Sequence, residues 1–407
     1  MRSYAVISMA LILILLFALP SLAQQKDNPD STVIFSFDPG QHSIKIPFDL
    51  YFNLIFLNVN INNHNLWFML DTGFECSLIN SDRVGQLGFE TTNVHSESAP
   101  GGEIQVSSVN NATLSFPGLK VIEKTLTAIP LSGLEPIVGR NIDGILGHDF
   151  FSHLAVEIDY ANQVITFYEP DEFHYSGKGE IVPVKIKNNE PFLMAEVEQL
   201  ERSPIPARFK IDTGSSDFIG FNGSFVQAEK VVPTSQKKIP AMGVAVGGTT
   251  KNYVTRIDGI KIGQIDIKNP VVGYSEDTTR GGDAGTIGGE FLHRFTTIFD
   301  YSRGRIILEE NKYFNDLYEY DMSGIFPTAE SPDFNIIKII SVAENSPAAE
   351  SALREGDIIE SIDGKPASQF TIAEIRHMMM QAGVEHSLKI KRGDQLLDVK
   401  LKLRKLI

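Results

Sequence analysis

One tripeptide, Asp-Thr-Gly, occurs twice in this chain of 407 residues, and its surroundings recur with it. The two copies begin at Asp71 and Asp212, which are 141 residues apart. A short segment ending in glycine follows each copy, and these glycines, Gly147 and Gly288, are also 141 residues apart. A shared spacing plan indicates an internal repeat, so we expect the chain to fold as two equivalent halves.

Further residues of the two halves are related by the same offset. They are Phe68 and Phe209, Phe150 and Phe291, Asp159-Tyr160 and Asp300-Tyr301, and Ile165 and Ile306. A lone Asp-Thr-Gly is weak evidence of function, because turns commonly use Asp and Gly. Two copies with matching surroundings favour a shared role for the two aspartates.

The segments before the two tripeptides have the patterns of β-hairpins. Residues 56–70, with an Asn-rich turn at 62–65, predict a hairpin that ends at Asp71. The second half predicts the same hairpin over 192–211, with a polar turn at 199–206. The chain is therefore expected to be mainly β.

Together these features resemble the pepsin and retropepsin class of aspartic proteases, in which each lobe contributes one Asp-Thr-Gly loop. The resemblance covers about residues 31–311. It implies a bilobal double β-barrel, with an N-terminal lobe over 31–170, a polar linker, and a C-terminal lobe over 180–311. Both lobes lie on one chain, so the paired aspartates need no homodimer.

The resemblance implies a catalytic dyad of Asp71 and Asp212. Aspartic proteases are the standard example of two carboxylates that share one proton, because both cannot ionise cheaply at short distance. The ionised member takes a proton from water, and the protonated member donates to the substrate carbonyl. Which aspartate holds the proton stays open here, and the alternative for each is a turn carboxylate that caps local amides.

Neighbours of the dyad receive supporting roles from the same resemblance. The threonines are expected to cross-link the loops, the glycines to bring amides near the carboxylates, and the serine to hydrogen-bond Asp212. These residues are Thr72, Gly73, Thr213, Gly214 and Ser215. Phe74 departs from the family pattern, since a small residue or Ser is usual there. We expect it to remove one hydrogen bond and to add bulk near the cleft.

Two glycine-containing stretches are candidates for mobile covers of the cleft. In the family, the region of the first lobe that corresponds to 96–103 is a flexible hairpin flap, and the second half has a glycine-rich stretch at 243–248. Glycine pairs would permit such motion. The alternative for both is an ordinary surface loop.

After Asn311 the pattern changes. The segments Asn-Ser-Pro-Ala-Ala, Arg-Glu-Gly-Asp-Ile-Ile and Ile-Asp-Gly-Lys-Pro resemble a PDZ domain in the bacterial arrangement, over about 320–407. The resemblance implies a β-barrel with two helices. A Ser-Pro start at 346–347 and a capping box at 371–374 predict where these helices begin.

A PDZ domain holds an extended peptide end, so protein C-termini are the partners that this second resemblance implies. The loop expected to hold the carboxylate is Ser323, Gly324, Ile325 and Phe326. Pro327 follows this loop and lacks the N–H that strand addition would use. The alternative is a PDZ fold that serves as a packing module or spacer.

The first 23 residues have a charged start, an apolar middle and a small-residue cleavage site, which predicts a signal peptide cleaved after Ala23. We therefore expect a periplasmic or secreted protein with no stable membrane anchor after cleavage; the alternative is an uncleaved anchor. One cysteine, Cys76, excludes an internal disulfide. The net charge of −15 argues against a nucleic-acid partner, and no cofactor or metal ligand array is expected.

Three functions fit these features. The first is an exported aspartic endopeptidase acting on peptide or protein substrates, with the PDZ domain recruiting or gating them. The second is a catalytically idle peptide-binding or adaptor protein on the same fold. The third is a self-processing enzyme whose main substrate is its own leader.

Overall fold

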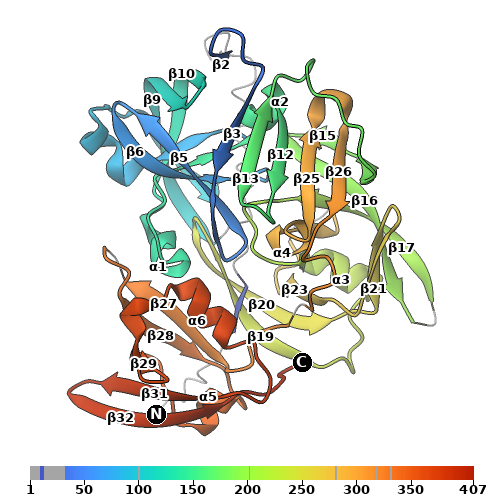
Figure 1. The fold of residues 1–407 in the computed structure, drawn as a ribbon. Coiled ribbons are helices and arrows are strands. Elements are labelled where there is room, and N and C mark those ends of the chain that lie inside the picture. The colour runs from blue at the N-terminus through green and yellow to red at the C-terminus, as the bar shows by residue number, and fades with distance from the viewer. Residues whose placement is uncertain are drawn as a thin grey trace.

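The structure is a computed structural model that describes residues 10–12, 33–99, 101–200, 202–279, 282–317, 319–330 and 332–407. Two β-rich lobes stand side by side, and a smaller C-terminal domain lies beneath them (Figure 1). The mainly β fold predicted from the strand patterns is confirmed.

The elements of the N-terminal lobe are β2 (Val33–Phe37), β3 (Ser43–Pro47), β4 (Asp49–Tyr51), β5 (Leu54–Ile61), β6 (His64–Leu70), β7 (Leu78–Asn80), β8 (Thr92–Ala99), β9 (Gly102–Phe116), β10 (Leu119–Ile129), α1 (Glu135–Val138), β11 (Gly144–Leu146), α2 (His148–His153), β12 (Ala155–Asp159) and β13 (Val164–Tyr168). Their main sheet has the order β2-β10-β7-β11-β6-β5-β9-β8.

The elements of the C-terminal lobe are β14 (Glu180–Pro183), β15 (Lys185–Lys187), β16 (Glu190–Gln199), β17 (Arg202–Ile211), β18 (Ile219–Phe221), α3 (Gly223–Glu229), β19 (Lys238–Ala245), β20 (Gly248–Arg256), β21 (Gly259–Ile262), β22 (Ile265–Lys268), β23 (Val271–Ser275), β24 (Gly285–Ile287), α4 (Gly289–Leu292), β25 (Phe295–Asp300) and β26 (Arg305–Glu310). From β19 to β22 their sheet has the order β19-β20-β23-β18-β24-β17-β16-β21-β22.

A six-stranded sheet, β14-β26-β25-β12-β13-β3, joins the two lobes. Its central pair is β12 and β25, which run antiparallel with Val156 opposite Phe299 and Asp159 opposite Thr296. These two strands occupy equivalent places in the repeat. The two halves are therefore related by an approximate two-fold axis through this pair, as the 141-residue offset predicts.

Repeated aromatic residues fill equivalent places in the core. Phe68 and Phe209 are fully buried, and so are Phe150 and Phe291. Burial of each large apolar side chain contributes about 1.5–3 kcal/mol relative to its exposure. The residues that carry the repeat in sequence thus also carry the packing of both lobes.

One predicted turn is shorter than expected. The stretch 199–206 was expected to be a turn, but β17 already begins at Arg202, so Pro204 and Pro206 lie inside a strand. In the described part of the chain, strand β24 pairs with β17 only at 209–211. The prolines therefore lie where β17 has a free edge, which a residue without an N–H tolerates.

The C-terminal domain comprises β27 (Ile325–Glu330), β28 (Ile336–Val342), α5 (Pro347–Glu350), β29 (Ile358–Ile362), β30 (Lys365–Pro366), α6 (Ile372–Met378), β31 (Glu385–Arg392) and β32 (Gln395–Lys402). Both predicted helix starts are formed: Ser346 caps α5, and Thr371 and Glu374 complete a capping box on α6.

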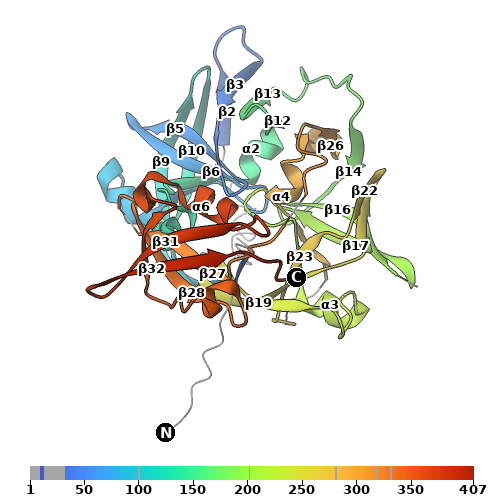
Figure 2. The ribbon, with the colours of Figure 1, turned by 60° about the horizontal axis from the view of Figure 1, so that its bottom comes forward.

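This domain packs directly on the lobes, beneath α1 and beside β19 (Figures 1 and 2). Gly139, at the end of α1, packs so closely against Ile372 of α6 that a Cβ on it would overlap that side chain. Phe326 is buried in a cluster with N-terminal-lobe residues such as Ile137. The domain is thus seated on the first lobe rather than held at a distance.

The predicted signal peptide, 1–23, lies outside the described residues except for 10–12. Those three residues form β1 (Ala10–Ile12), which pairs in parallel with β19. Among the described helices, none is long and apolar enough to cross a membrane.

Candidate active site

Each Asp-Thr-Gly loop begins where a strand ends beside a parallel partner. The Asp71 amide donates to the Leu146 carbonyl at 2.9 Å, and the Asp212 amide donates to the Ile287 carbonyl at 2.9 Å. Strands β6 and β11 are parallel, as are β17 and β24. The glycine-ending segments of the repeat thus hold the aspartate backbones in place.

The two loops are cross-linked by their threonines. The Thr72 amide donates to Thr213 Oγ1 at 3.0 Å, and the Thr213 amide donates to Thr72 Oγ1 at 3.0 Å. Each hydroxyl donates in turn to a carbonyl of the opposite half, Thr72 to Ile211 and Thr213 to Leu70, both at 2.8 Å. Four reciprocal hydrogen bonds in a buried site fix the aspartates relative to one another.

Glycine is required at the third position of both tripeptides. A Cβ on Gly73 would overlap the Asp212 carboxylate, and a Cβ on Gly214 would overlap the Asp71 carboxylate. Each glycine amide also donates to the carboxylate of its own loop, at 2.7 Å to Asp71 and 3.0 Å to Asp212. The glycines therefore bring amides and the opposite carboxylate together, as expected.

Both dyad carboxylates are completely buried. Burial raises the pKa of Asp71 well above its usual range, the charge of Asp212 adds to the rise, and Lys210 opposes it. A carboxyl group held protonated beside a second carboxyl is the electrostatic condition for sharing one proton.

A buried lysine, which the sequence interpretation missed, lies against one side of the dyad. Lys210 Nζ is 3.3 Å from Asp212 Oδ2 and 3.1 Å from Glu190 Oε1. Asp212 Oδ2 accepts no hydrogen bond from any of the described residues, so the contact with Lys210 is an ion pair rather than a directed hydrogen bond. The sequence signal was a charged residue two positions before Asp212, in a strand that ends in a buried loop.

One expectation about the second loop is wrong. Ser215 was expected to hydrogen-bond Asp212, but its buried hydroxyl has no hydrogen-bond partner among the described residues and lies against Gly288. Phe74, its counterpart in the first loop, was expected to add bulk near the cleft. Its side chain is buried in a hydrophobic cluster that also contains Ile104 and Val244.

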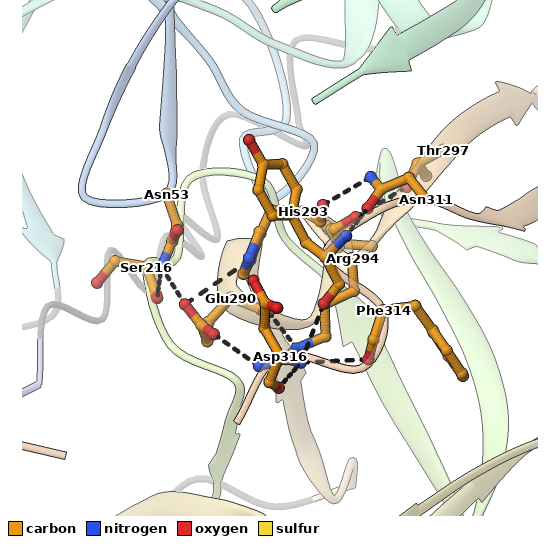
Figure 3. Close-up of polar contacts among 11 residues, drawn as sticks. Asn53, Ser216, Glu290, His293, Arg294, Thr297, Asn311, Phe314 and Asp316 are labelled. Carbon is orange, nitrogen blue, oxygen red and sulfur yellow. Dashed lines mark hydrogen bonds and ion pairs between the residues drawn. The ribbon is translucent and has the colours of Figure 1, made fainter. Parts of the chain in front are cut away.

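A polar network braces the second loop from outside (Figure 3). Asn53 Nδ2 donates to the Ser216 carbonyl at 3.3 Å and to Glu290 Oε2 at 2.7 Å. Arg294 Nη2 donates to Glu290 Oε1 at 3.0 Å, and its Nη1 donates to the Asp316 carbonyl. One network thus connects the first lobe, the second loop and the segment leading to the C-terminal domain. This network could not be predicted from sequence, because Asn53 is 237 positions from Glu290.

Two hairpins, β8–β9 and β19–β20, meet at their tips. Gly101, with φ +92°, approaches Gly248, with φ +134°, so closely that a Cβ on either residue would overlap the other backbone. Val244 and Ile104 of these hairpins share a buried cluster with Phe74 of the first loop. Both stretches predicted as flaps are therefore hairpin ends that close against each other.

The loop predicted to hold a peptide carboxylate is already engaged. The Gly324 amide donates to Asp321 Oδ2 at 2.6 Å, and the Ile325 amide donates to the Ser323 hydroxyl at 3.1 Å. Ser323 and Phe326 are buried. The amides of Gly324 and Ile325 thus have partners within the domain.

A cavity of about 400 Å³ lies between the C-terminal domain and the lobes. Its lining includes Asn53, Ser216, Phe326 and Arg376. Arg376 is buried between the rings of Phe52 and Phe326, and burial lowers its pKa to about 9. In the described part of the chain, no group of three or more His, Cys, Asp or Glu side chains is arranged to hold a metal ion.

Comparisons with known proteins bear on two parts of the chain. Residues 57–150 match the family model described as aspartyl protease, and residues 313–403 match the PDZ domain model. The first match contains Asp71, and the second contains the loop 323–326. Both resemblances are confirmed for these regions.

Individual relatives are similar over limited lengths or at low identity. A carboxy-terminal-processing protease of Bartonella bacilliformis is 37% identical over 86 residues, which are 20% of this chain and 19% of that protein. This chain thus matches about a fifth of that relative's length. The crystal structure of an aspartic proteinase from Irpex lacteus has 14% identity and a TM-score of 0.45, and covers 67% of this chain and 99% of that one.

Proposed function

We propose that this protein is an aspartic endopeptidase that uses the Asp71/Asp212 dyad. The observation that carries the proposal is the pair of buried carboxylates, held by reciprocal threonine hydrogen bonds, with the pKa of Asp71 raised by burial and by Asp212. The aspartyl protease match over 57–150 supports the same reaction class.

The reaction begins with water between the carboxylates. The ionised aspartate takes a proton from the water while the water oxygen bonds to the amide carbon. The protonated aspartate gives its proton to the carbonyl oxygen. The resulting diol collapses when its C–N bond breaks. One hydroxyl proton of the diol passes to the aspartate that had donated its proton. The aspartate that had accepted a proton from water gives that proton to the departing amine. The dyad is thereby restored.

Substrate entry requires the two hairpins to separate. Because their tips touch and both carboxylates are fully buried, this conformation is closed. We infer that the PDZ domain gates or recruits peptide substrates. Its Phe326 lies in the same cluster as hairpin residue Val244, which gives it a physical connection to the cover.

Cleavage of casein and of a mixed peptide library between about pH 3 and 8 tests the proposal, since carboxylates titrate over this range. Asp71→Asn and Asp212→Ala should each abolish cleavage while the protein stays folded. The exposed Asp171→Asn is the matched control and should retain activity. No cleavage by wild type at any pH would contradict the peptidase and leave peptide binding by an idle protein.

We also propose export through residues 1–23. The charged start, apolar middle and small-residue end of this segment support it. N-terminal sequencing of protein recovered from the cell envelope or medium should find a start at residue 24. If Asp212→Ala retains the leader that wild type loses, the protein removes its own leader instead.

A further inference from the structure

The dyad is asymmetric although the chain around it is repeated. The 141-residue offset places Lys210 where the first half has Met69. Met69 is fully buried in an apolar cluster, whereas Lys210, which is also buried, places an ammonium group beside the second aspartate. One carboxylate of the dyad thus has a cation beside it.

Lys210 is positioned to stay charged. Burial alone would lower its pKa, but the carboxylates of Asp212, Glu190 and Asp71 raise it above its usual value. The Nζ group contacts Asp212 Oδ2 and donates to Glu190 Oε1. The side chains of Lys210, Asp212 and Glu190 are 6%, 0% and 12% exposed, so solvent ions screen the interactions among these three charges little.

Four other charged or titratable groups lie near Asp212, Lys210 or Glu190: Asp217, Asp283, Glu290 and Tyr301. Asp217 and Tyr301 interact electrostatically with Asp212, but burial raises the pKa of each well above its usual value, which favours their neutral forms. Asp283 pairs with Arg208, and Glu290 pairs with Arg294. Among the described residues, Lys210 forms the one ion pair that either dyad carboxylate makes. The field at the dyad therefore distinguishes its two members.

We propose that Lys210 assigns the two roles: Asp212 is the ionised member that accepts the proton of water, and Asp71 is the protonated member that donates to the carbonyl oxygen. An anion is favoured beside a cation, so moving the shared proton from Asp71 to Asp212 would move the negative charge away from the ammonium. Lys210 acts through Asp212 and is a positioning residue.

Glu190 has a second part in this arrangement. An uncompensated lysine would favour ionisation of both aspartates and loss of the shared proton. Burial raises the pKa of Glu190 and Lys210 opposes that rise; in its ionised form Glu190, 3.1 Å from Nζ, offsets the lysine charge on the side away from the dyad. The Lys210–Glu190 pair therefore determines which aspartate holds the shared proton, and the dyad still retains that proton.

The test rests on the proposed peptidase function and uses the pH profile of kcat/KM. Lys210→Met, which copies the first half, should move both limbs of the profile to higher pH by about one unit, because an opposite charge has been removed. Glu190→Gln should move both limbs to lower pH, and Lys210→Arg should restore the wild-type profile. Lys268→Met, at an exposed ion pair, is the control.

If Lys210 and Glu190 had only a structural role, Lys210→Met and Glu190→Gln would not shift the pH profile of kcat/KM in opposite directions. Unchanged limbs in both variants, with kcat/KM still measurable, would overturn the inference while the peptidase stands.

A second measurement does not need activity. In protein with ¹³C-labelled aspartate carboxyls, assigned through Asp71→Asn and Asp212→Asn, Asp212 should report the ionised form near neutral pH and Asp71 the protonated form. Lys210→Met should reduce this difference. Ionisation of Asp71 before Asp212 would overturn the inference, whether or not the protein cleaves peptides. A catalytically silent wild type with the expected order would instead reject only the peptidase.

Discussion

Thr72 and Thr213 exchange hydrogen bonds across the approximate two-fold axis, each amide donating to the other hydroxyl at 3.0 Å. They are 141 residues apart in sequence and completely buried in the structure. The contact therefore links the two lobes at the same point where it fixes the two aspartates.

Removal of one threonine hydroxyl leaves a buried amide and a buried carbonyl without partners. We expect Thr72→Ala and Thr213→Ala each to lower the free energy of unfolding by about 1–3 kcal/mol. The double variant should lose less than the sum, because the two residues share one network. Urea denaturation measures the change. Thr72→Ser and Thr213→Ser keep the hydroxyl and should lose little; equal losses from Ala and Ser would argue that methyl packing matters instead.

Gly73→Ala should lower the rate of cleavage sharply, with less effect on folding, because the added Cβ overlaps the Asp212 carboxylate and displaces it. A misplacement on the order of 1 Å costs roughly a hundredfold in rate. Gly133→Ala is the matched control, since a Cβ there meets nothing within 4 Å. Activity assays beside circular dichroism separate the two effects, and near-normal activity of Gly73→Ala would contradict this geometry.

Gly248→Ala should loosen the contact between the two hairpins. The residue has φ +134°, and its Cβ would lie 2.8 Å from the Gly101 carbonyl oxygen. Such strain costs about 1–3 kcal/mol. Hydrogen exchange of amides in β19 and β20 should accelerate, while that of β12 and β25 should not. Gly85→Ala, where a Cβ meets nothing, provides the control. Unchanged exchange would mean that the tips do not hold each other closed.

Glu123 should make the folded protein less stable as pH rises. Burial, with a contribution from Asp149, raises its pKa to about 8 from a usual value near 4.5. Between these values the folded state holds a proton that the unfolded state has lost, so stability falls with increasing pH across that window. Glu123→Gln should raise the thermal midpoint at pH 8 and change it little at pH 4. The exposed Glu103→Gln should do neither, and a wild-type midpoint flat between pH 4.5 and 8 would reject the assignment.

Much of the scaffold could be predicted because the sequence signals for its strands and helix starts lie in neighbouring residues. The hairpin before Asp71 and the capping box at Thr371 follow from residues adjacent in the chain, and both are present. The equal offset also predicted which two aspartates meet. Hydrophobic periodicity and cap residues report backbone structure directly, so these features were accessible from sequence.

The parts that could not be predicted depend on side-chain directions and on distant contacts. Nothing local tells that the Ser215 hydroxyl turns toward Gly288 or that Phe74 turns into the interior. The Lys210–Glu190 pair joins two neighbouring strands, and the Asn53–Glu290 bond crosses 237 positions. Because one sequence does not reveal which polar groups meet, the electrostatics of the site emerged only from the structure.

The central pairing of β12 with β25 has a consequence for how the two halves differ. In a symmetric dimer of identical chains, each of the two aspartates would have its own lysine beside it. The two lysines would then have equal effects, and neither aspartate would be favoured to hold the shared proton. Because both copies here belong to one chain, Lys210 occurs once and Met69 takes the mirrored place. Covalent duplication thus lets a twofold scaffold hold a directional active site, in which each aspartate can specialise while the frame around them stays symmetric.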